Sequence, residues 1–394
     1  MTWPTVEIQE FCRTGSGTTP SRKNPDFFEG AIPWVKSGEL REKVILSAEE
    51  HVSEQALKTT ALKLVPKGAI LVAMYGATVG RVGLLGIEAT TNQAVCHVVP
   101  DPSKADTRYM FHLLQAKAAE LVSRGVGGAQ PNISQGVIKS LKIPLPPLDE
   151  QRRIAGILDQ ADALRRLRAR ALDKLNTLGQ AIFHEMFGGI DSSSEVASDH
   201  RELGDIADVV SGVTKGRKVK GQVLREVPYL AVSNVQDRFL KLDVVKTIEA
   251  TEGEINRFKL LKDDILLTEG GDPDKLGRGT LWSNELPECI HQNHVFRVRV
   301  KNENVRPVFL SWQLGSPTGK AYFLSMAKQT TGIASINKTQ LKGFPVSMPP
   351  LHQQIAFEER LQQIARHERQ QREASRNAEA LFTSLQHRAF RGDL

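Results

Sequence analysis

The chain has few cysteines and no long hydrophobic run. Its 394 residues include only Cys12, Cys96 and Cys289, which lie far apart in the sequence. An odd, scattered set of cysteines excludes a disulfide framework or a cysteine-based zinc site and is typical of a reducing compartment. No apolar stretch reaches the roughly 20 residues that a membrane-spanning helix needs, and the first residues carry no signal pattern. We therefore expect a cytoplasmic protein without a membrane segment.

Several motifs of DNA-acting enzymes are also missing. Neither Pro146-Pro147 nor Pro349-Pro350 follows the Asn or Asp that an adenine methyltransferase motif contains. The segment 315–320 is one residue too short for a phosphate-binding loop. His291 and His294 have no cysteine or carboxylate at a ligand spacing. The sequence therefore predicts no catalytic residue, no metal and no cofactor in this chain.

The net charge of the chain is compatible with binding to nucleic acid. The chain holds 52 Lys and Arg against 45 Asp and Glu, a formal net charge of +7. Such a surplus permits binding to phosphate groups but does not establish it.

One stretch occurs twice, at residues 146–189 and 349–392. The copies align without a gap at an offset of 203 residues, and 12 of 44 positions are identical. Each copy begins after a Pro pair, ends at Gly and carries apolar residues in steps of three and four, the pattern of a long helix with a seam. Neither helix can bury its seam alone, so we expect the two to pair. The seam residues are Ile154, Leu158, Ala161, Leu164, Ala171, Leu175, Leu178 and Ile182 in the first copy, and Phe357, Leu361, Ile364, Ala374, Ala378, Leu381 and Leu385 in the second.

The segments before the two helices are also related to each other. Short strand-like runs separated by turn-rich loops predict a mixed α/β domain in each, and Ser16-Gly17 of the first aligns with Ser211-Gly212 of the second. The predicted fold is therefore a pair of pseudo-symmetric globular α/β domains and two long antiparallel helices that form a coiled coil. A parallel pairing is the alternative, but it requires the chain to return along the helices. The predicted parts are a first α/β domain at 1–145, a long helix at 146–189, a linker at 190–200, a second α/β domain at 201–348 and a second long helix at 349–394.

A body with two related heads suits a ligand that looks alike after a half-turn, and duplex DNA is such a ligand. The loops of both heads hold Arg, Lys, Asn, Gln and Thr, which can contact phosphates or base edges, with Gly that permits close backbone approach. For any one of these residues, an ordinary solvated surface position is an equally good interpretation. The candidate DNA-binding residues are Thr18, Thr19, Arg22, Lys23, Tyr75, Thr78, Arg81, Asn92 and Gln93 in the first head, and Lys215, Arg217, Lys218, Lys275, Arg278, Gln292 and Asn293 in the second. For Tyr75 and Trp34, packing in the core or at an edge is favoured over base contact.

Short motifs in both heads and at the start of the first helix carry a family resemblance. They are Pro146–Gln151 with Ile154-Ala155, Gln130–Ser134, Leu71–Ala73, Gly76–Arg81, Thr91–Ala94, Leu267–Asp272, Lys275–Gly279 and Gln292–His294. With these motifs the whole chain resembles the specificity (S) subunit of type I restriction–modification enzymes. The second helix departs from the family pattern at Gln353, where the pattern has Glu, and this weakens the favourable charge in the first helical turn.

The resemblance implies a non-catalytic protein that recognises double-stranded DNA. Each head would read one half of a split target, and the paired helices would set the gap between the halves. Two methyltransferase (M) subunits that use S-adenosylmethionine would dock on the chain, and two restriction (R) subunits that use ATP and Mg²⁺ would be further partners. Two alternatives remain open: a methyltransferase or nuclease piece with an unrecognised active site, and a scaffold that binds proteins through its heads.

Overall fold

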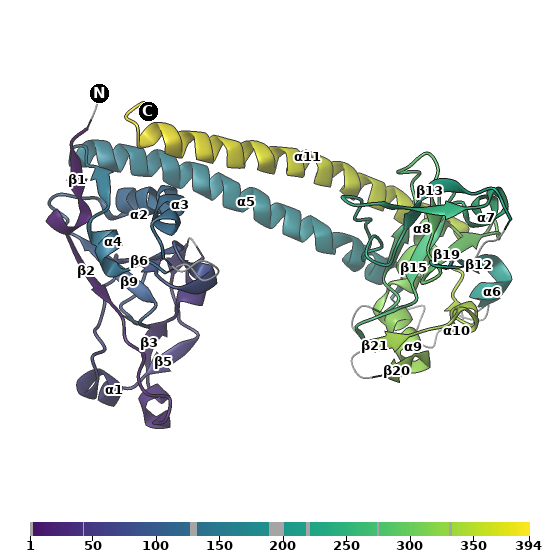
Figure 1. Ribbon diagram of the computed structural model, residues 1–394, viewed down its shortest axis with the longest axis horizontal. Helices are drawn as coiled ribbons and strands as arrows, with labels where there is room; N and C mark the ends of the chain where they lie inside the picture. The colour runs from purple at the N-terminus through teal and green to yellow at the C-terminus, as the bar shows by residue number, and fades with distance from the viewer. Residues whose placement is uncertain are drawn as a thin grey trace. The chain divides into compact units, whose positions relative to one another are not determined.

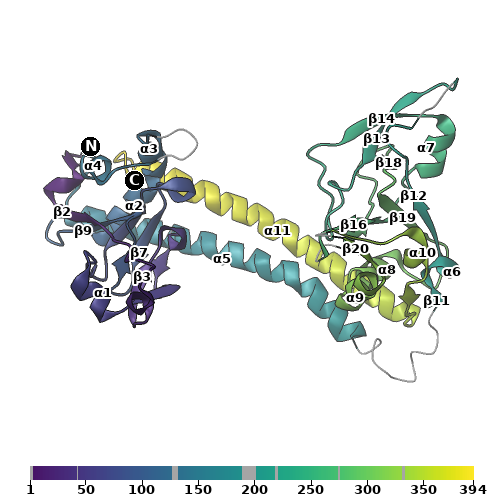
Figure 2. The same ribbon diagram turned by 60° about the horizontal axis from the view of Figure 1, so that its bottom comes forward.

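The computed structural model describes residues 3–41, 43–126, 132–188, 201–217, 221–273, 276–330 and 333–394. The chain divides into two compact units, Met1–Ala171 with Gln371–Leu394 and Leu172–Gln370. Two long helices, α5 (Leu148–Phe187) and α11 (Leu351–Ala389), contribute to both units (Figures 1 and 2). We call the rest of unit 1 the first head and the rest of unit 2 the second head.

The first head is built on a five-stranded sheet in the order β2-β9-β6-β7-β4. A second sheet has three strands, in the order β5-β3-β8. The runs expected to be strands, Ile32–Val35 among them, are confirmed, because their β-branched residues fill the buried faces of both sheets. The elements are β1 Thr5–Glu7, β2 Cys12–Ser16, β3 Ile32–Val35, β4 Val44–Ile45, β5 Glu50–Val52, α1 Glu54–Thr59, β6 Ile70–Ala73, β7 Val82–Leu85, β8 Thr90–Thr91, β9 Val95–Pro100, α2 Thr107–Ala116, α3 Ala118–Ser123, α4 Gln135–Lys139 and β10 Lys142–Pro144, with 3-10 turns at Ile8–Glu10, Pro25–Phe28, Ser37–Glu39 and Gly76–Thr78.

The second head repeats this plan with a four-stranded sheet β12-β19-β15-β17 and a three-stranded sheet β14-β13-β18. In each head the first strand of the main sheet, β2 or β12, pairs antiparallel with a long strand, β9 or β19, which also pairs with the next strand of that sheet, β6 or β15. The elements are β11 Arg201–Glu202, α6 Leu203–Ile206, β12 Ala207–Ser211, β13 Arg225–Leu230, β14 Lys246–Ala250, α7 Glu252–Phe258, β15 Ile265–Thr268, β16 Gly270–Gly271, β17 Gly279–Leu281, β18 Ile290–His291, β19 Val295–Val300, α8 Pro307–Leu314, α9 Pro317–Met326, β20 Lys328–Thr330, β21 Ile333–Ser335, α10 Lys338–Lys342 and β22 Pro345–Val346.

The long helices are antiparallel, as expected. In unit 1 the beginning of α5 packs with the end of α11: Ile154 and Leu158 share a core with Phe382 and Ala389. In unit 2 the end of α5 packs with the beginning of α11, and Phe183 contacts Phe357 with ring centroids 5.4 Å apart. These contacts identify the helices as an antiparallel coiled coil.

The expected seam is only partly buried. Ile154, Leu158 and Phe357 are fully buried, but Leu164, Leu178 and Leu381 are 40%, 40% and 48% exposed. The large side chains of Phe382 and Phe183, at positions next to the expected seam, occupy the helix interface instead, because they also reach the adjoining head. Which residues of the long helices are buried therefore depends on contacts with the heads as well as on contacts with the partner helix.

None of the described helices is both long enough and apolar enough to cross a membrane.

Candidate nucleic-acid interface

In the first head, the candidate loops leave the main sheet from one end. β6 stops at Ala73 opposite Val95, where β9 begins, and β2 stops at Ser16 opposite Cys96. The backbone N–H of Met74 then donates to the carbonyl of Ala94 at 2.8 Å, and that of Gly17 donates to Val95 at 3.1 Å. The loops that follow β2 and β6, and the turn before β9, therefore share one edge of the head.

The second head repeats this arrangement at the level of single hydrogen bonds. Its strand ends are Ser211 opposite Phe296 and Thr268 opposite Val295. The Glu269 N–H donates to the His294 carbonyl at 3.0 Å, which corresponds to the bond from Met74 to Ala94. One backbone framework thus presents two different sets of side chains.

Two equivalent glycines let the backbones approach closely at this edge. A Cβ atom on Gly17 would lie 2.2 Å from the Thr91 carbonyl oxygen, and one on Gly212 would lie 1.8 Å from that of His291. Neighbouring amides hold the contact, because the N–H of Thr18 donates to Thr91 at 2.9 Å and that of Val213 to His291 at 2.8 Å. Only glycine fits these two positions without moving the facing turn.

The structure brings together four of the predicted residues of the first head. The Thr19 hydroxyl is hydrogen-bonded to the Gln93 side chain, and the Thr18 hydroxyl donates to the Ala61 carbonyl at 3.2 Å. Asn92 donates its backbone N–H to Val35 at 3.1 Å, while its side-chain oxygen is buried without a hydrogen-bond partner. Gln93 is exposed beside them.

Tyr75, Thr78 and Arg81 lie on the turn between β6 and β7. The Thr78 hydroxyl donates to the Tyr75 carbonyl at 3.2 Å and closes the turn. Arg81 is exposed, and Tyr75 is 43% exposed, which fits the expected packing at an edge and not a position in the core. Trp34, by contrast, is 2% exposed, and its indole N–H donates to the Thr18 carbonyl at 3.0 Å, so its predicted core position is confirmed.

Arg22 is tied to its own head. Its guanidinium lies 2.7 Å from the Glu50 carboxylate and 4.2 Å from the centroid of the Phe28 ring. These contacts order the loop after β2. The next residue, Lys23, is exposed.

In the second head Arg217 is similarly engaged. It lies 2.5 Å from Glu254 and also donates to the backbone carbonyls of Thr214 and Glu249. Lys215 is exposed beside it. Lys218, predicted with them, lies outside the described residues, as does Lys275.

Arg278, Gln292 and Asn293 also lie in the second head. Arg278 donates to the Gln236 side chain at 3.3 Å and to the Val232 carbonyl at 3.4 Å, so it links the loop before β17 to the loop after β13. The Gln292 N–H donates to Leu230, and Asn293 neighbours His294, whose ring is 2.5 Å from Glu269.

The pair of Arg217 and Glu254 makes a pH dependence testable. The hydrogen bond from Arg217 lowers the pKa of Glu254 from 4.5 to about 2. A carboxylate with a depressed pKa in the folded state contributes stability that is complete above pH 4.5 and is lost as the pH falls toward 2. We expect Arg217→Ala to remove about 1–2 kcal/mol of this contribution after allowance for solvent screening. Urea unfolding between pH 2 and 6 measures it: the stability curves of the variant and the original protein should converge at the acid end. Lys215→Ala is the control and should run parallel to the original protein throughout, whereas parallel curves for Arg217→Ala would contradict the role of the pair.

Sequence reasoning did not identify the residues that join each head to its long helix. Gln151 is fully buried; its amide nitrogen donates to the carbonyls of Lys104 and Pro146 at 2.9 and 2.8 Å, and its oxygen accepts the Asp106 N–H at 2.8 Å. The identity of Gln151 in the two repeats was the only signal of its role.

The equivalent residue in the second unit makes the same three bonds. Gln354 is also fully buried and donates to Asn304 and Pro349 at 3.0 and 2.8 Å. Its oxygen accepts the Arg306 N–H at 2.8 Å. In each unit one buried glutamine at the start of the helix therefore makes its three hydrogen bonds to main-chain atoms only.

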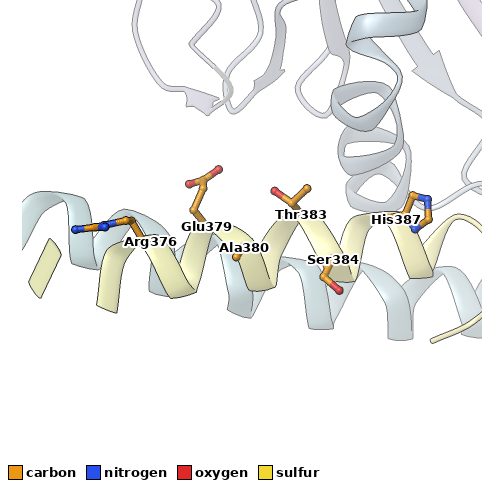
Figure 3. Close-up of a pocket in the computed structure, with 6 residues that line it drawn as sticks. All are labelled: Arg376, Glu379, Ala380, Thr383, Ser384 and His387. Carbon is orange, nitrogen blue, oxygen red and sulfur yellow. The ribbon is translucent and has the colours of Figure 1, made fainter. Parts of the chain in front are cut away.

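The surface also has a hollow on α11, away from the strand ends just described. Its six lining residues lie on one face of this helix, and five of them have polar side chains (Figure 3). Among the described residues, no three His, Cys, Asp or Glu side chains gather at a spacing that could hold a metal ion. The hollow is lined by Arg376, Glu379, Ala380, Thr383, Ser384 and His387.

Comparison with known proteins places this architecture in a family. The chain is 29% identical over 168 residues to the specificity subunit of the type I restriction enzyme EcoR124I/EcoR124II of Escherichia coli, which covers 41% of each chain. It is 25% identical over 380 residues to the MjaVIII specificity subunit of Methanocaldococcus jannaschii, covering 92% of this chain and 86% of the relative. The match spans less than two thirds of the first two curated relatives, 41% and 58% of their lengths.

A solved chain from a study of complex assembly and conformational transition of the type I restriction–modification system has the same fold. The match covers 100% of this chain and 98% of that one, with a TM-score of 0.65 at 18% identity. The family model described as the type I restriction modification DNA specificity domain matches residues 1–177 and again residues 195–375. Two copies of one domain, each with its head and most of a long helix, account for the repeated hydrogen bonds, and the chain belongs to the type I restriction–modification DNA specificity family.

Proposed function

We propose that the chain is the DNA-recognition subunit of a type I restriction–modification complex and that each head reads one half of a split target. One observation carries the proposal. The ends of equivalent strands hold the same backbone hydrogen bonds in both heads, but different side chains follow them. A shared framework with exchanged side chains is what two readers of different short sequences require.

Apart from Tyr75, Gln292 and Asn293, the candidate residues that the structure describes divide into two groups by exposure and contacts. Arg81, Gln93, Lys23 and Lys215 are exposed and are our candidates for direct contact with DNA. Those that order the loops carry ion pairs or internal hydrogen bonds, and Lys218 and Lys275 stay candidates on the sequence alone. The ordering group is Thr18, Thr19, Arg22, Thr78, Asn92, Arg217 and Arg278.

The chain itself would perform no catalysis. Two methyltransferase subunits would bind S-adenosylmethionine and dock on the chain, and two restriction subunits would use ATP and Mg²⁺. The paired helices would set the distance between the two half-sites. Because its proposed ligand is chromosomal DNA, we place the protein in the cytoplasm.

A DNA-binding experiment distinguishes this proposal from the two alternatives. The target is first obtained by sequencing methylated adenines in the host genome, which returns both half-sites and their gap. The purified chain with methyltransferase subunits should bind that duplex with an affinity that falls steeply with salt, because phosphate contacts release counterions. Salt-independent binding, or no binding, would favour a protein scaffold. Methylation or cleavage by the chain alone would favour an enzyme.

Arg81 provides a test at the level of one base pair. We expect Arg81→Ala to relax specificity at one position of the first half-site, at a cost of about 1–3 kcal/mol for the original base. Binding to a set of targets with single substitutions measures this. Lys58→Ala is the control, because Lys58 is exposed on α1 and contacts only Glu54 at 3.2 Å. An equal loss on every target would identify Arg81 as a phosphate contact.

A further inference from the structure

The two units pack their heads against the helix pair with unlike residues at equivalent positions. In unit 1, His112 of α2 faces Phe382 of α11, with ring centroids 6.1 Å apart. An offset of 200 residues relates the heads here and one of 203 relates the helices, so the equivalent pair in unit 2 is Trp312 and Gly179. A Cβ atom on Gly179 would lie 2.4 Å from the Trp312 ring.

The side chains are complementary in size across each contact. A medium ring faces a large ring in unit 1, and a larger ring faces no side chain in unit 2. Trp312 cannot withdraw from Gly179, because the Arg238 guanidinium stacks on its ring at 3.5 Å and Phe183 and Phe357 pack nearby. A neighbouring contact, by contrast, is nearly the same in both units: Tyr109 meets Phe390 edge to face, and Phe309 meets Phe187 likewise.

Polar and charged contacts between the two helices also involve unlike residues at equivalent positions of the two repeats. Arg168 donates to the side-chain oxygen of Gln371 at 2.9 Å. These two residues occupy equivalent positions in the two repeats. Two first repeats paired together would bring Arg168 against a second Arg168.

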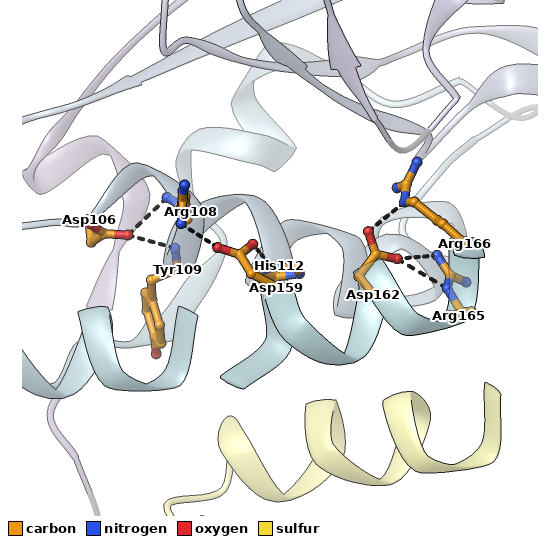
Figure 4. A network of polar contacts seen from close by, with 8 residues as sticks. All are labelled: Asp106, Arg108, Tyr109, His112, Asp159, Asp162, Arg165 and Arg166. Carbon is orange, nitrogen blue, oxygen red and sulfur yellow. Dashed lines mark hydrogen bonds and ion pairs between the residues drawn. The ribbon is translucent and has the colours of Figure 1, made fainter. Parts of the chain in front are cut away.

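Arg165 belongs to a network on α5. It binds Asp162 at 2.7 Å, and Asp159, one turn earlier on the helix, binds His112 at 2.8 Å (Figure 4). Arg165 also binds Glu379 of α11 at 3.1 Å. The residue equivalent to Arg165 in the second helix is Glu368. Two second repeats paired together would therefore bring Glu368 against Glu379.

We propose that these contacts form a pairing code: the first repeat fits the second repeat of the same chain and does not fit another copy of itself. A first repeat paired with another first repeat would leave a void between His112 and Gly179. It would also bring the Arg168 side chains of the two copies against each other. A second repeat paired with a second would force Trp312 against Phe382. Voids, overpacking and opposed like charges all destabilise an interface, which is how helical interfaces reject wrong partners. The code does not depend on what the heads bind.

The full-length chain tests the code through matched glycine substitutions on α5. Gly156 has no atom within 4 Å of an added Cβ, so Gly156→Ala should raise the midpoint of thermal unfolding by about 2–4 °C through helix propensity. Gly179→Ala should lower it by a similar amount or more, because the methyl group meets Trp312. An increase for Gly179→Ala equal to that for Gly156→Ala would overturn the proposal.

A double-mutant cycle tests whether the pair acts as a unit. Phe382→Gly recreates the contact of two first repeats and should lower the unfolding midpoint by on the order of 10 °C. Adding His112→Trp installs the unit 2 pair in unit 1 and should recover part of that loss, although His112→Trp alone is destabilising. Strictly additive losses would mean that the two residues are not matched to each other, and the code would be refuted.

Discussion

Replacing Gln354 by methionine is expected to lower the free energy of unfolding by about 2–4 kcal/mol, because one buried and two part-buried hydrogen bonds to main-chain groups are lost, and a buried group left unpaired costs about 1–3 kcal/mol. The groups are the carbonyls of Asn304 and Pro349 and the N–H of Arg306. Methionine retains the length of the side chain, so the change removes polarity more than volume. Denaturant unfolding measures the loss, and amide exchange at Arg306 should accelerate with it.

Gln363→Met is the matched control for this result. Gln363 lies on the same helix and is exposed, so its replacement should change stability by less than about 0.5 kcal/mol. Gln151→Met should reproduce the large loss in unit 1, since its three bonds are the same. Equal effects of the Gln354 and Gln363 substitutions would show that the joint between head and helix does not depend on the glutamine.

The second large effect is expected from Gly212→Ala. The added methyl group would overlap the His291 carbonyl oxygen, and the turn that carries Gln292 and Asn293 would have to move by more than 1 Å, judged from the contact distance of 1.8 Å. Overpacking of this kind costs about 1–3 kcal/mol or more. Under the proposed function the moved turn no longer presents its side chains to DNA, and affinity should fall by on the order of 100-fold, about 2.7 kcal/mol.

Binding to targets altered in either half-site separates the local effect from general unfolding. Gly212→Ala should abolish discrimination at the second half-site and retain it at the first, and Gly17→Ala should do the reverse. Gly253→Ala is the control, because only one atom lies near its added Cβ, at 3.9 Å. If Gly212→Ala bound every target as the original protein does, the turn before β19 would have no part in recognition.

The sequence was sufficient for the architecture. Repeated motifs predicted two related α/β heads, and the apolar spacing predicted two antiparallel helices, because hydrophobic periodicity and repeat identity are local properties of the chain. The break between α2 and α3 at Lys117 was not foreseen, since Thr107–Ser123 has a continuous helical pattern.

Side-chain contacts could not be predicted in the same way, because they depend on residues distant in the chain. The sequence did not predict that Arg22 and Arg217 pair with Glu50 and Glu254, which lie in other elements that only the fold brings near. Leu178 fits the helical period yet is 40% exposed, because Phe183 has a head to pack against and Leu178 does not.

The glutamine at each joint between head and helix hydrogen-bonds to peptide groups alone, while ion pairs such as that of Arg306 with Glu358 add side-chain contacts there. Any sequence that can adopt the same backbone path offers the carbonyl and N–H that Gln151 or Gln354 needs. Substitutions can therefore change the other residues of a head while these main-chain hydrogen bonds to the helix are retained. Recombination can then exchange whole heads and with them the target preference of the chain.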